Sequence, residues 1–244
     1  MIDEKHALFF ENGSAEIYTV SGNGGLGRMV NQINGSWRTS WTDIEYYSAG
    51  GKDFILFYQQ ADGGYAAMYE KNKNGGLGHR AHTTSNWRST WHDIEYYSAG
   101  GQDFMLFYQQ TGGGYAAMYK LKADGKLGTK IASTKGWRAT WHDIEHYRYG
   151  NQDFMLFYQQ SGGSYEMYKI NNNGTLGSLV RSSKGWLSNW TDIEYYNVGG
   201  TDYLFFYRQS TGLGTVYEVA ANGNLGKKVH ESKNYRKTWT DIVF

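Results

Sequence analysis

The stretch Trp-Arg-Thr-Ser-Trp-Thr-Asp-Ile-Glu-Tyr-Tyr, residues 37–47, decides the fold because it recurs along the whole chain. Close copies begin at Trp87, Trp137 and Trp186, and a shortened copy begins at Tyr235 and ends with the chain at Phe244. The copies follow one another at a near-constant step of about 50 residues, a period typical of propellers, solenoids and other repeat architectures. One structural unit is therefore used five times.

Each complete repeat contains four strand-like segments, which in the first complete copy cover 41–47, 53–60, 65–71 and 77–84. They are rich in Tyr, Phe and Ile, are separated by Gly-rich turns and show no 3.6-residue apolar stripe, so they predict an antiparallel meander with almost no helix. An Asn-Gly or Asp-Gly pair, which suits the positive φ angles of a tight hairpin, precedes the last segment. The pairs are Asn23-Gly24, Asn74-Gly75, Asp124-Gly125, Asn173-Gly174 and Asn222-Gly223.

The two ends of the chain complement each other. Residues 5–36 supply three strand-like segments and residues 239–244 supply one. Joining them would complete a fifth unit and remove the exposed sheet edges that an open array leaves. We therefore predict an all-β, five-bladed β-propeller of four-stranded antiparallel blades, in a single domain over 1–244. The expected blades are approximately 41–90, 91–140, 141–189, 190–238, and 239–244 plus 1–40.

Composition narrows the classes of partner. The chain has 24 Lys+Arg against 23 Asp+Glu and no Cys. Near-neutral charge without a basic cluster argues against nucleic acid, and no apolar run is long enough to insert into a membrane. The first residues carry Asp3 and Glu4 where a signal peptide is basic. We expect a protein that is cytoplasmic or is secreted by a route that this chain does not encode.

Repeated acids are the first candidates for chemistry. An Asp recurs in all five copies, as Asp43, Asp93, Asp143, Asp192 and Asp241. A carboxylate repeated at a strand position is more often a structural hydrogen-bond acceptor than a catalyst. A Glu follows two residues later in four copies (Glu45, Glu95, Glu145 and Glu194), where it could bind a cation or water, but Val243 breaks the ring. The seven His lack zinc-ligand spacing, so we predict no catalytic residue, no metal and no cofactor.

The connections between repeats carry the candidate ligand-binding residues. An exposed indole beside a guanidinium suits a sugar, because the aromatic face packs on the pyranose ring while polar groups bond its hydroxyls. The alternative is that these Trp side chains belong to the core between blades. Strand-end Gln side chains and nearby Tyr rings extend the candidate set, although such Gln also support turns. The predicted ligand-binding residues are Trp37, Arg38, Trp87, Arg88, Trp137, Arg138, Trp186, Tyr235, Arg236, Gln60, Gln110, Gln160, Gln209, Tyr65, Tyr115 and Tyr165.

Near-identical repeats, with Gly-Trp at the junctions Gly136-Trp137 and Gly185-Trp186, give the chain an architecture that is similar to the tachylectin-2-type lectin propellers. The sequence of residues 185–193 and 202–212 more closely resembles propeller repeats found in tandem in actinobacterial proteins. The first resemblance implies one shallow sugar site per blade or blade junction and glycan partners, N-acetylated sugars among them.

Three functions follow as alternatives. A multivalent lectin gains avidity from repeated weak sites. A ligand-free scaffold or an engineered consensus propeller would show the same repetition. A glycoside hydrolase would need unlike carboxylates at the channel, and nearly identical blades do not supply them. We therefore expect a lectin and not an enzyme.

Overall fold

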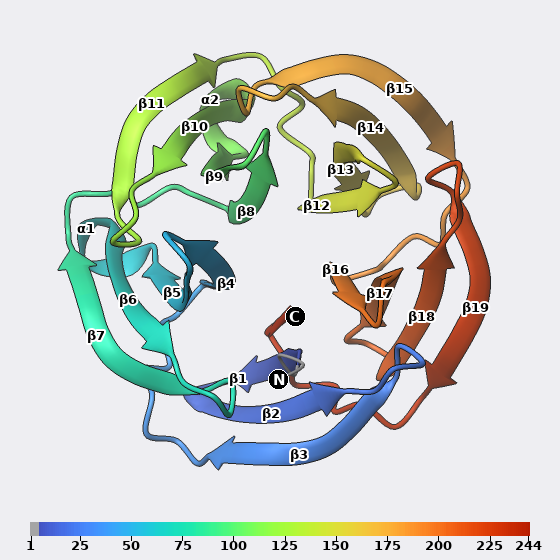
Figure 1. Ribbon diagram of the computed structural model, residues 1–244, viewed down its shortest axis with the longest axis horizontal. Helices are drawn as coiled ribbons and strands as arrows, with labels where there is room; N and C mark the ends of the chain where they lie inside the picture. The colour runs from blue at the N-terminus through green and yellow to red at the C-terminus, as the bar shows by residue number, and fades with distance from the viewer. Residues whose placement is uncertain (1–4) are drawn as a thin grey trace.

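The computed structural model describes residues 5–244, and its strands form five sheets arranged as blades around a central axis (Figure 1). Blade I contains β20 (Asp241–Val243), β1 (His6–Glu11), β2 (Ser14–Val20) and β3 (Leu26–Ile33). Blade II contains β4 (Asp43–Ala49), β5 (Lys52–Gln59), β6 (Tyr65–Lys71) and β7 (Leu77–Thr84). Blade III contains β8 (Asp93–Ala99), β9 (Gln102–Gln109), β10 (Tyr115–Leu121) and β11 (Leu127–Thr134). Blade IV contains β12 (Asp143–Tyr149), β13 (Gln152–Gln159), β14 (Ser164–Ile170) and β15 (Leu176–Lys184). Blade V contains β16 (Asp192–Val198), β17 (Thr201–Arg208), β18 (Leu213–Val219) and β19 (Leu225–Ser232).

The predicted five-bladed ring is confirmed, and so is its closure between the two ends of the chain. The last strand, β20, pairs antiparallel with β1. The pairing continues outward because the backbone amide of Thr240 donates to the carbonyl of Phe10 at 2.8 Å. Asp3 and Glu4, on which the expectation about a signal peptide rests, lie outside the described residues.

In residues 5–244, helix is confined to two single turns, α1 (Ala61–Gly64) and α2 (Thr111–Gly114), each of which joins the second and third strands of a blade. Glycine is required at the end of these turns. Gly114 has φ +71°, and a Cβ there would lie 1.9 Å from the carbonyl oxygen of Trp137. The turn of one blade thus packs directly on the junction that leads to the next. No helix in residues 5–244 is long and apolar enough to span a membrane.

The repeated Asp side chains fasten each blade to the next, as their structural reading predicts. Asp43 accepts a hydrogen bond from the Ile94 amide at 2.8 Å, and Asp93 accepts one from the Ile144 amide at 2.7 Å. The same contact closes the ring, since the Ile44 amide donates to Asp241. The inner strands are therefore joined by carboxyl hydrogen bonds to backbone amides that would otherwise face the channel unpaired.

Candidate functional site

The junction aromatics lie at the clefts between blades, half-buried rather than fully exposed. Trp37 stacks against Phe10 of blade I at 6.4 Å and meets Phe57 of blade II edge-on at 4.9 Å, measured between ring centroids. Trp87, Trp137, Trp186 and Tyr235 hold the corresponding places. Each ring is thus part of the core between two blades and also part of the wall of a cleft, so the two sequence-based readings coexist.

A guanidinium lies over the second Trp of every repeat. Arg38 lies 5.6 Å from the Trp41 ring centroid, and Arg88, Arg138 and Arg236 hold the same position over Trp91, Trp141 and Trp239. Blade V has Leu187 at the junction, yet Arg208, from the end of β17, places its guanidinium 4.9 Å from the Trp190 ring. Sequence reasoning did not assign Arg208 this role, although its appearance in the one repeat that lacks the junction Arg was the available signal.

The predicted Gln side chains join the blades. The amide nitrogen of Gln110 donates to the carbonyl of Trp141 at 2.6 Å, and Gln160 and Gln209 donate in the same way to Trp190 and Trp239. Gln60 bonds Trp91 likewise, at 2.7 Å. These contacts favour the supporting role over ligand binding, because one donor of each amide is already engaged.

Two of the three predicted Tyr side chains join an Arg. The Arg38 guanidinium lies 4.7 Å from the Tyr65 ring, and that of Arg88 lies 4.4 Å from the Tyr115 ring. Tyr165 was grouped with them, but Ser164 holds that register position opposite Gln159, as Tyr65 does opposite Gln59. The missing residue of blade IV falls in the turn before β14, so Tyr165 faces the other side of its sheet.

Tyr165 closes a cleft whose counterpart between blades III and IV is open. Its ring stacks on Trp186 at 4.1 Å, and the cavity beside it between blades IV and V measures only about 10 Å³. Ala116 holds the same register position in blade III, opposite Tyr108. The cavity there, between blades III and IV, has a volume of about 240 Å³ and is lined by Trp137 and Leu176. A third cleft, between blades I and II, measures about 250 Å³.

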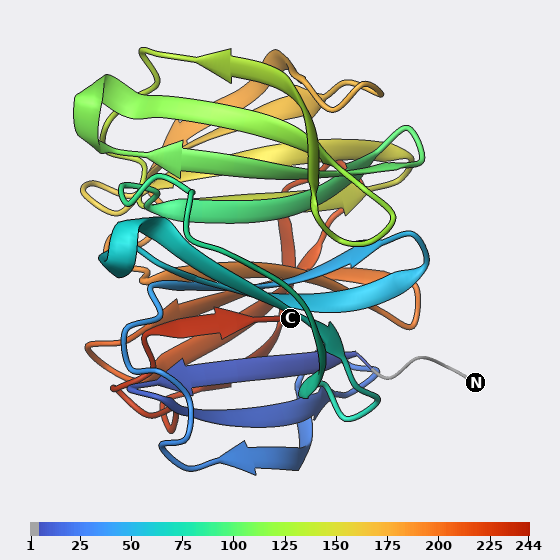
Figure 2. The same cartoon turned by 90° about the vertical axis from the view of Figure 1, so that its left-hand side faces the viewer.

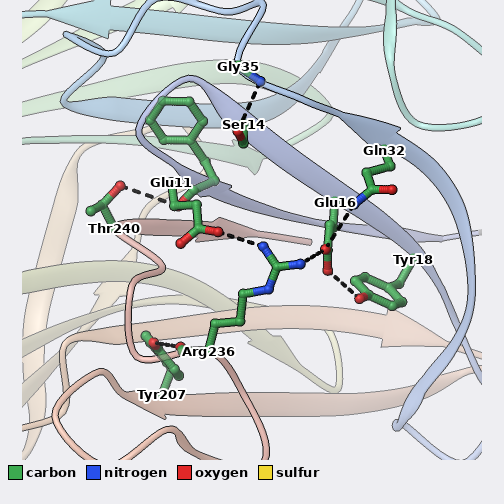
Figure 3. Close-up of polar contacts among 10 residues, drawn as sticks. Glu11, Ser14, Glu16, Tyr18, Gln32, Gly35, Tyr207, Arg236 and Thr240 are labelled. Atoms are coloured by element: carbon green, nitrogen blue, oxygen red, sulfur yellow. Dashed lines mark hydrogen bonds and ion pairs between the residues drawn. The ribbon is translucent and has the colours of Figure 1, made fainter.

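Two clefts carry an acid that neutralises the junction Arg. Arg138 forms an ion pair with Glu166 at 2.5 Å. Arg236 bonds Glu11 at 2.6 Å and also contacts Glu16, which accepts a hydrogen bond from Tyr18 (Figure 3). Glu16 and Glu166 share one register position, opposite Phe9 and Phe157. Blade II has Ala67 at that position, opposite Phe57.

The central channel is the other candidate site. One mouth holds a cavity of about 320 Å³ lined by Glu45, Glu95, Glu145 and Glu194, and a second cavity of about 200 Å³ lies among the five Asp. Burial raises the pKa of Asp143 to about 7 and that of Asp241 to about 8. The pKa of each of the four Glu is raised well above its ordinary value by the same cause. In residues 5–244 no group of three or more His, Asp or Glu side chains is arranged to hold a metal ion.

Solved structures with this fold include enzymes. An exo-β-1,3-galactanase from Phanerochaete chrysosporium, solved with β-1,3-galactotriose, superposes with TM-score 0.59 at 10% identity over 94% of this chain and 63% of the galactanase. A periplasmic gluconolactonase from Pseudomonas aeruginosa gives TM-score 0.51 at 9% identity, covering 97% of this chain and 98% of the lactonase. A chain of a nidogen/laminin complex gives TM-score 0.51 at 11% identity, with 98% and 97% covered. No family model matches the sequence, and no curated protein sequence is similar to it.

These similarities show the propeller fold, and they correct one prediction. The expectation that the chain is not an enzyme is wrong as an exclusion, because the solved structures that superpose on this chain include a gluconolactonase and a galactanase. The fold is therefore no ground for ruling out an enzyme. The narrower resemblance to tachylectin-2-type lectins and to actinobacterial repeats stays a prediction.

Proposed function

We propose that this chain is a multivalent carbohydrate-binding protein whose sugar sites are the open clefts between blades. The observation that carries the proposal is the pair of clefts of about 240 and 250 Å³, each walled by a half-buried junction indole. In the cleft between blades I and II, the rings of Trp37 and Tyr65 lie beside the guanidinium of Arg38. An apolar ring for the pyranose face and a donor for its hydroxyls are thus supplied together.

Multivalency follows from the rigidity of the ring. The clefts lie at fixed positions around one body, held apart by the inter-blade bonds of the Asp and Gln side chains. Weak sites in such an array reinforce one another on a surface that presents many copies of a glycan. Since Tyr165 closes the cleft between blades IV and V, fewer than five sites are expected.

The test is to close one open cleft with the side chain that already closes another. Ala116→Tyr places in blade III the residue that blade IV carries at the same register position. A glycan array identifies a bound sugar, and calorimetric titration then counts the sites on both proteins. We expect the variant to lose one site while the affinity of the others is unchanged. No binding of any glycan by the unsubstituted protein, or an unchanged site count in the folded variant, would overturn the proposal.

A second candidate function is hydrolysis at the channel, favoured by one departure from symmetry. His146 stands where the other complete blades have Tyr46, Tyr96 and Tyr195, and its backbone amide donates to Glu95 at 2.7 Å. Blade IV therefore gives the Glu95–Glu145 side of the mouth different surroundings, as unlike acid and base roles require. Turnover of aryl glycosides and aldonolactones that disappears in Glu145→Gln would support this activity. Turnover that survives the substitution would place the reaction elsewhere.

A further inference from the structure

The cleft between blades I and II is positively charged. Its lining residues are Ser36, Trp37, Arg38, Trp41, Phe57, Tyr65, Tyr69, Leu77 and Arg80. Two of these are arginines, and no acidic side chain is among the described residues that line it. Arg38 is exposed and is held over the Tyr65 ring, so its guanidinium is positioned but still open to a ligand.

The charge of a cleft depends on two register positions that change together. In blade II these positions hold Ala67 and Arg80. In blades IV and I the first position holds Glu166 or Glu16, and the second holds an apolar side chain, Leu179 or Met29. In blades II and III the first position holds Ala67 or Ala117, and the second holds a basic side chain, Arg80 or Lys130. Four of the five junctions thus fall into two kinds, one with an Arg–Glu ion pair and one with two cations that no carboxylate in residues 5–244 is shown to pair. Blade V differs from both, with Thr215 and Lys228 at these positions and Lys228 paired with Glu231.

Leu179 and Met29 are 49% and 48% exposed, so the choice between a cation and an apolar side chain at this position is not a packing requirement. A guanidinium that has no carboxylate partner in the protein can form two parallel bonds to a carboxylate or sulfate of a ligand. In the cleft between blades III and IV, Glu166 already takes that place on Arg138.

We propose that the cleft between blades I and II selects anionic saccharides, sugars that carry a carboxylate or a sulfate group. The inference rests on the proposed lectin function and assigns the ligand class of that site. The cleft between blades III and IV, with its internal ion pair, takes a neutral sugar instead. Sequence-similar junctions therefore bind chemically different ligands.

The experiment measures binding of three tetrasaccharides to the full chain by calorimetry. Chitotetraose is neutral, a hyaluronan tetrasaccharide carries carboxylates only, and a keratan sulfate tetrasaccharide carries sulfates only. We expect an affinity for the anionic probes about tenfold higher than for chitotetraose at low salt, a preference that shrinks as salt screens the exposed charges. Binding of only one anionic probe supports the proposal and identifies the recognised group.

Two substitutions taken from the chain itself provide the controls. Ala67→Glu copies Glu166 into the cleft between blades I and II and should lower the number of anionic-probe sites by one. Glu166→Ala is the reciprocal change and should raise that number by one. Arg80→Met copies Met29, changes only an exposed side chain and tests the charge even if Ala67→Glu does not fold.

The outcomes separate the two proposals. Binding of chitotetraose with affinity equal to or greater than that of both anionic probes overturns the inference and leaves the lectin function standing. The same conclusion follows if Arg80→Met and Glu166→Ala leave anionic binding unchanged. If none of the three probes and no other glycan binds, the proposed function itself fails.

Discussion

Tyr165→Ala tests whether one side chain decides that a cleft is open or closed. Tyr165 is 8% exposed, and its ring lies 4.1 Å from the Trp186 ring, measured between centroids. Removing it loses about 1.5–3 kcal/mol of apolar burial and about 0.5–1.5 kcal/mol of aromatic stacking. The blades themselves tolerate the gap, because Ala116 leaves a cavity of about 240 Å³ at the equivalent place. We therefore expect a loss of about 2–4 kcal/mol without collapse of the ring.

For a chain of this size that loss corresponds to a Tm lower by roughly 4–16 °C. Differential scanning calorimetry measures the change, with Ala116→Tyr as the matched control, whose ring enters existing space and should change Tm by only a few degrees. Titration with the sugar bound by the cleft between blades III and IV should then count one additional site in Tyr165→Ala. An unchanged Tm would refute the filling role of Tyr165, and a lowered Tm with no new site would refute the link between open clefts and binding.

Three further predictions concern the ring. Tyr97→Phe should lower the free energy of unfolding by about 1 kcal/mol, because the Tyr97 hydroxyl donates to the Gly174 carbonyl at 2.7 Å. Tyr147→Phe should be neutral or stabilising, since the buried Tyr147 hydroxyl has no hydrogen-bond partner among the described residues. Urea titrations that rank the two variants otherwise contradict this assignment. Tm should fall between pH 6 and pH 8, because the raised pKa values of about 7 and 8 at Asp143 and Asp241 mean that the folded state binds more protons than the unfolded state, so stability is lost as pH rises. Burial lowers the pKa of His92 and His142, and this effect raises stability with pH. A Tm that rises across this range would show that the carboxyl groups do not dominate. Gln110→Ala should lower the free energy of unfolding by about 1 kcal/mol, because the Trp141 carbonyl loses its donor. Gln110→Glu, which cannot donate when ionised, should lower it by the same amount, and chemical denaturation of both variants measures the two losses.

Repetition made the fold predictable, and the exceptions to repetition limited the prediction of the site. The five copies of the Asp and of the Asn-Gly turn each had one physical explanation. The structure gives each copy of the Asp the same role, as acceptor of a backbone amide on the next blade. Tyr165 was misplaced because a one-residue deletion can fall in a turn or in a strand. Only the register shows that it fell in the turn, which reverses the face on which Tyr165 lies.

The acids of the clefts were missed for a different reason. Arg236 and Glu16 stand at opposite ends of the chain and meet only when the ring closes (Figure 3). Figure 2 shows the same closure from the side, with β20 beside the first strands of blade I. No local pattern in the sequence reports such a contact. The fold must be known before the register positions of neighbouring blades can be compared.

Each cleft is assembled from parts of two consecutive blades, and this explains how nearly identical repeats produce different sites. In the cleft between blades III and IV, blade III contributes Ala116 and the junction that follows it contributes Trp137. Blade IV supplies Glu166, whose carboxylate meets Arg138 of that junction. One substitution in a blade therefore changes the cleft that the side chain faces and leaves the cleft on the other side unchanged. Tyr165 and Glu166 are adjacent in β14, yet Tyr165 contacts Trp186 in the cleft between blades IV and V, and Glu166 contacts Arg138 in the cleft between blades III and IV. Because successive side chains of a strand point to opposite faces, each blade can tune two sites independently without disturbing the inner ring of Asp contacts.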